Sequence, residues 1–230
     1  MIKKLLIALM ILTGSMSLKS QKIFMLGDSH VFAKIYPEKT AEVIRQKYPD
    51  MQFNFWGKNG AEFSTYNTHP EYLDSLYAFA PEILIVHLGT NDSYGFTFNK
   101  EQYINEMEIF YRNLKDTLPE CKIVIVTPFI NKRWLNKKRT KWRVNANTTE
   151  CAQETLKFAA DHADTYVIDN NADAGMSYLK DRRLIRKDNV HLTEEGYGRL
   201  GQQVADSLLL ISDLWVVSPS SQEETEYISK

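Results

Sequence analysis

The side chains best suited to chemistry in this sequence are a serine, an aspartate and a histidine that lie far apart along the chain. Ser29 follows the apolar run 23–26 through the turn Gly27-Asp28, and Asp188 and His191 are three residues apart near the last helical pattern. A serine hydroxyl becomes a nucleophile when a histidine takes its proton and an acid orients that histidine. The sequence therefore predicts a relay of Ser29, His191 and Asp188 for acyl transfer, with acid and base delivered by one short segment.

Acyl transfer also needs hydrogen-bond donors for the oxyanion that forms. Gly60 lies in the polar block 57–61 and Asn91 in the block 89–92. We expect the backbone N–H groups of Ser29 and Gly60, together with the side-chain amide of Asn91, to form the oxyanion hole. A glycine suits this position because its backbone can approach a substrate without a Cβ in the way.

For most of the other titratable residues near these blocks, the sequence favours a structural role over a catalytic one. We interpret Asp28 as a structural hydrogen-bonding residue and Asp92 as a brace for its loop. Asp169, at the end of the fifth expected strand, is a rival to Asp188 as the acid. His87 lies inside an expected strand and is interpreted as a core histidine. His30, next to the nucleophile, either lines the pocket or packs beside Ser29.

The polar blocks need a scaffold, and the pattern of apolar residues predicts one. Short apolar runs at 22–26, 51–56, 82–88, 122–126 and 165–168 alternate with helical patterns at 37–48, 71–79, 100–118, 148–160 and 193–211. This alternation predicts an α/β fold, a three-layer α/β/α sandwich with a parallel sheet of about five strands. The carboxyl ends of parallel strands lie at one edge of a sheet, so the blocks that contain Ser29, Gly60 and Asn91 should converge there.

Composition narrows the class of protein. The chain has 230 residues, of which 43% are hydrophobic, and a net charge of −1, values typical of one soluble globular domain. The near-neutral charge argues against a nucleic-acid partner. The five histidines are scattered without metal-ligand spacing, and no glycine-rich phosphate loop is present, so we predict no metal and no cofactor.

The two ends of the chain differ from its middle. Residues 1–20 combine the basic pair Lys3-Lys4, an apolar run at 5–12 and small residues at 13–17, which is typical of a signal peptide. The apolar run is too short for a stable membrane span; the alternative is a buried N-terminal strand or helix. We expect one domain, which contains the acyl-transfer residues, at 21–217, a polar and flexible tail at 218–230, and an exported protein, periplasmic or extracellular.

The two cysteines leave their redox state open. Cys121 should open a strand and Cys151 should lie in the helix that follows. An exported chain could pair them as a disulfide, whereas the alternative is two partly buried free thiols. Neither cysteine has a metal-ligand spacing around it.

A basic segment follows the fourth expected strand. Residues 121–149 contain no acidic residue, and seven lysines and arginines crowd 132–143, with Trp134 and Trp142 between them. One hypothesis is a wall or lid that attracts an anionic polymer, with the tryptophans as platforms for sugar rings. The alternative is a solvated surface loop.

Taken as a set, the blocks resemble those of the GDSL/SGNH hydrolases, a flavodoxin-like family of esterases and acyl hydrolases. The resemblance runs from about residue 22 to 210; Ser29 matches the nucleophile block, Gly60 and Asn91 match the second and third blocks, and Asp188 and His191 match the last. His30 stands where the name-giving motif has leucine. The resulting Gly-Asp-Ser-His, with the segments 89–95 and 143–145, is similar to the branch that includes peptidoglycan O-acetylesterases.

The resemblance implies a secreted serine esterase that hydrolyses O-acyl esters, above all O-acetyl esters, on carbohydrate or cell-wall glycan. His30, Trp134, Trp142 and Arg143 are the expected substrate contacts. A small-acyl lipolytic esterase, lysophospholipase or thioesterase is the alternative among enzymes. A non-catalytic glycan-binding relative is the alternative of another class. The expected partner is an acylated glycan or small ester, and the oligomeric state stays open.

Overall fold

The computed structural model describes residues 21–94, 98–129, 139–171, 182–188 and 190–215, with the backbone alone at 139–146 and 182. At its centre lies a five-stranded sheet of β1 (Lys22–Gly27), β2 (Gln52–Gly57), β3 (Ile83–His87), β4 (Lys122–Val126) and β5 (Thr165–Ile168). All paired strands are parallel and their order is β2-β1-β3-β4-β5. This is the order of flavodoxin-like sheets, and it confirms the predicted α/β fold class.

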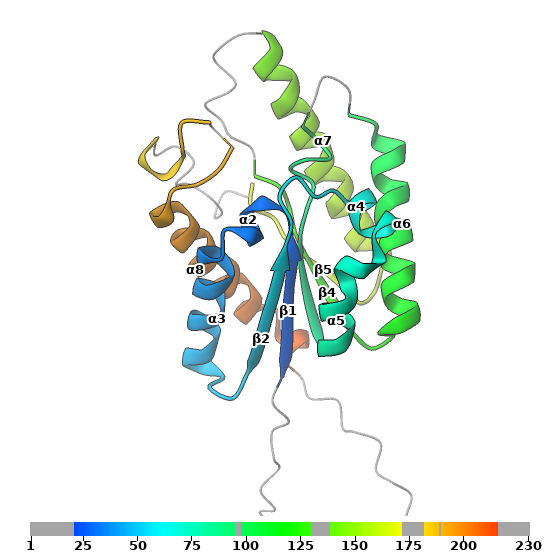
Figure 1. The fold of residues 1–230 in the computed structure, drawn as a ribbon, viewed down its shortest axis with the longest axis vertical. Coiled ribbons are helices and arrows are strands. Elements are labelled where there is room, and N and C mark those ends of the chain that lie inside the picture. Colours follow the sequence, from blue (N-terminus) through cyan, green and yellow to red (C-terminus); the bar gives the residue numbers. More distant parts are fainter. Residues whose placement is uncertain (1–20, 95–97, 130–138, 172–181, 189, 216–230) are drawn as a thin grey trace, which may run out of the picture.

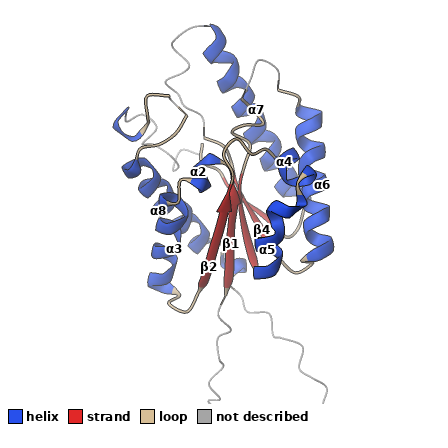
Figure 2. Ribbon diagram, in the orientation of Figure 1, coloured by secondary structure: helices blue, strands red, loops and turns tan. Residues whose placement is uncertain are grey.

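Helices cover both faces of the sheet (Figures 1 and 2). On one face lie α3 (Ile35–Lys47) and α8 (Glu194–Leu210), and on the other α4 (Phe63–Thr68), α5 (Asp74–Phe79), α6 (Lys100–Thr117) and α7 (Arg139–Asp161). Side chains alternate along each strand: Ile23 and Met25 of β1 join the core beneath α3 and α8, while Phe24 and Leu26 join the opposite core. Burial on both faces explains why β1, β3 and β4 are continuous apolar runs.

The polar blocks meet at the carboxyl ends of the strands. After β1, the short helix α2 (Ser29–Phe32) turns over the end of the sheet. The Lys58 N–H after β2 donates to the carbonyl of Gly27 at 3.0 Å. A Cβ on Gly57 would lie 2.4 Å from the backbone nitrogen of Phe32, so glycine is needed there for α2 to sit against the end of β2.

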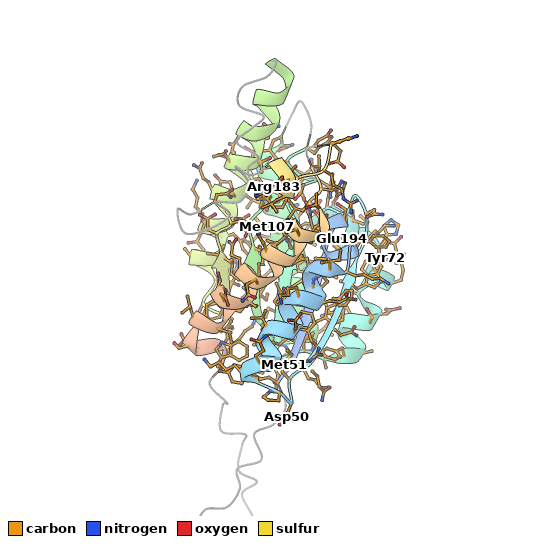
Figure 3. The ribbon with its side chains drawn as sticks, turned by 90° about the vertical axis from the view of Figure 1, so that its left-hand side faces the viewer. Asp50, Met51, Tyr72, Met107, Arg183 and Glu194 are labelled. Carbon is orange, nitrogen blue, oxygen red and sulfur yellow. The ribbon has the colours of Figure 1, made fainter. Side chains whose placement is uncertain are left out.

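The segment that holds Asp188 and His191 lies at this same end of the molecule. Figure 3 shows its flanking residues, Arg183 and Glu194, far from Asp50 and Met51, which precede β2 at the amino ends of the strands. Chain segments more than 150 residues apart in sequence are thereby brought to one edge of the sheet, as the parallel arrangement predicts.

The structure corrects several predicted helix bounds. The strands agree with prediction to within one or two residues, but α2 and α4 were not predicted because four and six residues are too few to show a helical period. The helix predicted at 148–160 begins nine residues earlier, at Arg139. The basic segment is therefore helical from Arg139 onward, and residues 130–138 lie outside the described residues.

Three other expectations concern the cysteines and the chain ends. Cys121 and Cys151 are both buried free thiols, so the disulfide alternative is wrong. The predicted signal peptide and the polar tail lie outside the described residues. Among the described residues, no helix is long and apolar enough to cross a membrane.

Candidate active site

Ser29, His191 and Asp188 form one hydrogen-bonded chain. The Nε2 atom of His191 lies 3.0 Å from Ser29 Oγ, and its Nδ1 atom lies 2.9 Å from Asp188 Oδ2. These are hydrogen-bond distances on both sides of one imidazole, with the serine and the histidine 162 residues apart. The arrangement can pass a proton from the hydroxyl to the ring while the carboxylate holds the ring in place.

A short hairpin delivers the acid and the base as a unit. Asp188 Oδ1 accepts from the backbone N–H groups of Val190, at 2.9 Å, and His191, at 3.0 Å. Ile185 and Leu192 form an antiparallel bridge at the base of the hairpin. Immediately afterwards α8 begins. The position of the Asp188–His191 pair is thus determined by local hydrogen bonds and by the start of that helix.

The electrostatics of Asp188 suit its place beside an imidazole. Partial burial by itself would raise the pKa of Asp188, but hydrogen bonds from Val190 and from the backbone and ring of His191 outweigh it and lower the pKa. A carboxylate that stays ionised favours the imidazolium form of its neighbour. The rival acid Asp169 is engaged elsewhere, accepting from Thr127 Oγ1 at 3.1 Å and from the Asn171 N–H at 2.8 Å.

The residues expected to supply the oxyanion donors line the same cavity. Ser29, Gly60 and Asn91 line one cavity of about 740 Å³, together with His191. Neither the Ser29 nor the Gly60 N–H donates to an acceptor among the described residues. Gly60 has φ +74°, and a Cβ there would meet nothing within 4 Å. Backbone conformation and open access to the cavity, not crowding, therefore favour glycine at this position.

Two buried aspartates hold the loops that carry these donors. Asp28 Oδ1 accepts from the His30 N–H at 2.9 Å, and Asp92 accepts from the N–H groups of Phe63 and Gly89 at 3.2 and 3.0 Å. The Asn91 amide donates to the carbonyl of Ala61 at 2.9 Å. Burial raises the pKa of both Asp28 and Asp92 to about 7. Both are placed as braces, as their sequence positions predicted.

Of the two alternatives for His30, the structure shows packing beside the nucleophile and not lining of the cavity. His30 is completely buried and does not line the cavity. Its Nδ1 lies 3.2 Å from the hydroxyl of Tyr197, and Tyr197 lines the cavity in its place. The ring of His30 stacks on His87 with centroids 5.6 Å apart, so the predicted core histidine His87 has a second imidazole as its neighbour.

The other three expected substrate contacts lie in or next to the segment that the structure does not describe. Trp134 lies outside the described residues, and for Trp142 and Arg143, which lie in α7, the structure describes the backbone alone. Sequence reasoning missed Lys34, Tyr94, Arg186 and Tyr197, which all line the cavity. The available sequence signals were the proximity of Arg186 to the Asp188–His191 pair and the place of Tyr94 within the segment 89–95. Among the described residues, no cluster of three His, Cys, Asp or Glu side chains could hold a metal ion.

Comparison with known proteins assigns the chain to a family. The model of the GDSL-like lipase/acylhydrolase family matches residues 25–199. The chain belongs to this family. It is therefore a serine ester hydrolase, as the sequence predicted. No curated protein matched the chain.

Solved structures share the fold of this hydrolase at low sequence identity. A peptidoglycan O-acetylesterase superposes with a TM-score of 0.68 at 13% identity, covering 86% of this chain and 92% of its own. An acetyl xylan esterase superposes with a TM-score of 0.64 at 18% identity, covering 81% of this chain and 99% of its own. A catalytic mutant of an acetylxylan esterase from Geobacillus stearothermophilus superposes with a TM-score of 0.62 at 15% identity, covering 86% of this chain and 97% of its own.

Proposed function

We propose that this esterase is exported and removes O-acetyl groups from carbohydrate by a Ser29–His191–Asp188 mechanism. The observation that carries the proposal is the unbroken chain of contacts, 3.0 Å from Ser29 Oγ to His191 Nε2 and 2.9 Å from His191 Nδ1 to Asp188. Acetylesterases among the structural neighbours support the acyl group, and the apolar run behind Lys3-Lys4 supports export.

The proposed reaction has two halves. Ser29 Oγ attacks the acetyl carbonyl as its proton moves to His191 Nε2, and Asp188 stabilises the imidazolium. The oxyanion lies against the N–H groups of Ser29 and Gly60 and the amide of Asn91. The intermediate collapses, the C–O bond to the sugar breaks, and the sugar oxygen takes the proton from His191. Water then repeats the sequence on the acetyl-serine and releases acetate.

The size of the cavity supports a leaving group larger than a simple alcohol. A volume of about 740 Å³ falls in the range that accommodates drug-sized ligands, and an acetyl group fills only a small part of it. Phe32 and Tyr94 line the cavity and are 52% and 62% exposed. Such exposed aromatic faces can pack against a sugar ring.

The decisive experiment measures acetate released from O-acetylated peptidoglycan by the wild type and by Ser29→Ala, with an aryl acetate as the control ester. We expect release from both substrates to depend on Ser29, with residual activity below a hundredth of wild type. Retained activity in Ser29→Ala would contradict the nucleophile. Cleavage of the aryl acetate alone would remove the cell-wall substrate and leave other acetylated glycans and short lipid esters to be tested.

A non-catalytic glycan-binding protein is distinguished by covalent labelling. A fluorophosphonate should label the wild type and not Ser29→Ala, because only a serine activated by its histidine reacts at a useful rate. An unlabelled wild-type protein that still binds glycan would overturn the catalytic proposal.

A further inference from the structure

The cavity beside Ser29 has a charge pattern that ester hydrolysis does not require. Lys34 and Arg186 both line it, and none of the described residues that line it is an aspartate or a glutamate. Lys34 directly precedes α3, and Arg186 precedes α8. The helices α3 and α8, which follow these two residues in the chain, pack side by side on one face of the sheet (Figure 1).

Lys34 is held in an unusual backbone conformation. Its φ is +67° and its ψ is −42°, and the Ile35 N–H donates to the carbonyl of Ala33 at 2.8 Å across it. This is a γ-turn of the rare, strained type, in the left-handed region where glycine is the usual residue. Strain of this kind persists where a function needs it, and here it places a lysine at the cavity.

Arg186 is held by the same hairpin that carries His191. Its backbone N–H donates to the carbonyl of His191 at 2.8 Å, next to the bridge between Ile185 and Leu192. Its charge also reaches the cavity wall. Burial raises the pKa of Tyr197 to about 12, and the positive charge of Arg186 opposes part of that rise. A shift of the hairpin that moves His191 would therefore also move the guanidinium.

We propose that Lys34 and Arg186 recognise a carboxylate on the substrate, so that the enzyme prefers acetylated acidic sugars over neutral ones. The inference rests on the proposed esterase function and specifies its substrate class. A guanidinium binds a planar carboxylate through two parallel hydrogen bonds, and an ammonium adds a point charge. Among the described residues, no aspartate or glutamate lines the cavity, and the carboxylate of Asp188, two residues from Arg186, contacts the backbone and the ring of His191.

The test compares two substrates that differ only in charge, an O-acetylated methyl glucuronoside and its neutral uronamide. We expect the wild type to favour the acid in kcat/KM by about tenfold at low ionic strength, as for charge-assisted hydrogen bonds discounted for solvent exposure. The difference should lie mainly in KM and shrink in ~0.5 M salt, because salt screens exposed charges. Equal kcat/KM values for the two substrates would overturn the proposal.

Substitutions assign the preference to the two cations. Lys34→Gln and Arg186→Gln should each lower the acid-to-amide ratio about threefold, and the double variant should bring it close to one. Lys47→Gln, in the last turn of α3, and Lys187→Gln, next to Arg186, are matched controls because each removes one exposed charge that does not line the cavity. Equal losses in the controls would show a general charge effect and contradict the assignment.

Lys34→Gly separates recognition from folding. Glycine adopts a positive φ without strain, so this variant should melt at a temperature equal to or above that of the wild type. Its acid-to-amide ratio should nevertheless fall as in Lys34→Gln. A Lys34→Gly protein that keeps the full preference would remove Lys34 from the proposal.

Binding to Ser29→Ala keeps this test independent of catalysis. Calorimetry with the two intact substrates should show tighter binding of the acid even without turnover. If the aryl acetate is not cleaved by the wild type but this binding preference holds, the esterase proposal fails and the carboxylate site stands. A sugar phosphate bound more tightly than the acid would overturn the carboxylate in favour of phosphate.

Discussion

Two aspartate–histidine pairs lie close together in this protein and behave differently. Asp28 precedes His30 by two residues, and Asp188 precedes His191 by three. In each pair the aspartate accepts a hydrogen bond from the backbone N–H of its own histidine, at 2.9 Å for the first and 3.0 Å for the second. Only in the second pair does the carboxylate also contact the ring, at 2.9 Å.

Access to water separates the two pairs. The side chains of Asp188 and His191 are 47% and 34% exposed, and the pKa of Asp188 is lowered by its hydrogen bonds despite partial burial. Asp28 and His30 are completely buried; burial raises the pKa of Asp28 to about 7 and lowers the pKa of His30 well below its ordinary value. Burial thus favours the neutral form of both residues in the first pair, whereas the carboxylate of Asp188 in the second pair is held in its charged form by its hydrogen bonds.

The buried pair continues into a polar layer beneath the active site. His30 lies between His87, with centroids 5.6 Å apart, and His191, 5.8 Å away. Within the described part of the chain, His30 Nε2 and both ring nitrogens of His87 have no hydrogen-bond partner. Unpartnered buried polar groups reduce stability, by about 1–3 kcal/mol each. The layer is therefore costly to the fold, while the exposed pair does the proposed chemistry.

Removal of the exposed imidazole should have the largest effect. His191→Ala takes away the base for Ser29, and we expect kcat for an aryl acetate to fall by about 10⁴-fold or more, as in other triads. Circular dichroism should show an unchanged fold, because His191 is partly exposed. A loss below a hundredfold would contradict its role.

Substitution of the exposed acid, Asp188, should lower kcat more than substitution of the buried acid, Asp28. Asp188→Asn is expected to lower kcat about 10³–10⁴-fold because the amide cannot stabilise the imidazolium. Asp28→Asn should cost roughly tenfold or less, since Asp28 acts only through the backbone of His30 and, at 3.5 Å, through the amide of Asn91, and not on the ring of His191. Parallel kinetics at pH 7.5 would test this ranking, and a larger loss in Asp28→Asn would reverse the comparison.

The buried layer should be visible in the pH dependence of stability. Between about pH 4 and 6.5, Asp28 holds a proton in the folded protein and has lost it in the unfolded chain. Its contribution to the free energy of unfolding therefore falls as the pH rises. His87, whose pKa burial lowers to about 3, is neutral when folded and protonated when unfolded, so its contribution rises. Each slope is about 1.4 kcal/mol per pH unit. Opposite signs should leave the wild-type free energy of unfolding with a shallow slope.

Single substitutions should remove this compensation. Asp28→Asn should make the free energy of unfolding rise more steeply with pH across that window, and His87→Phe should shift the slope by a similar amount in the opposite direction. Urea denaturation at half-unit pH steps measures both slopes. Identical slopes in the wild type and both variants would contradict neutral burial of the layer.

The smallest effect is expected for His30→Leu. This change introduces the leucine of the name-giving motif and removes one unpartnered buried nitrogen, together with the 3.2 Å contact to Tyr197. We expect kcat to change by less than about tenfold, with equal or greater stability. A loss close to that of His191→Ala would give His30 a direct part in catalysis and erase the difference between the pairs.

Local sequence was enough to predict the scaffold. Continuous apolar runs predicted β1, β3 and β4 to within one residue because a strand buried on both faces must be apolar throughout; β2 was predicted from the alternation of Phe53 and Phe55 with polar residues. The polar blocks around Ser29, Gly60 and Asn91 could be assigned to one edge because parallel strands share their carboxyl end. Asp188 and His191 could be paired because three residues of separation allow a local hydrogen bond, which the hairpin provides.

What the sequence by itself determined is therefore the set of strands, their direction and the residues at their ends. The tertiary structure alone decided which of those residues meet water. His30 is hidden because Tyr197, 167 residues away, packs over it, and Lys34 and Arg186 share a cavity only because α3 and α8 lie side by side. Burial and cavity lining depend on contacts between segments remote in sequence, and no local pattern records them.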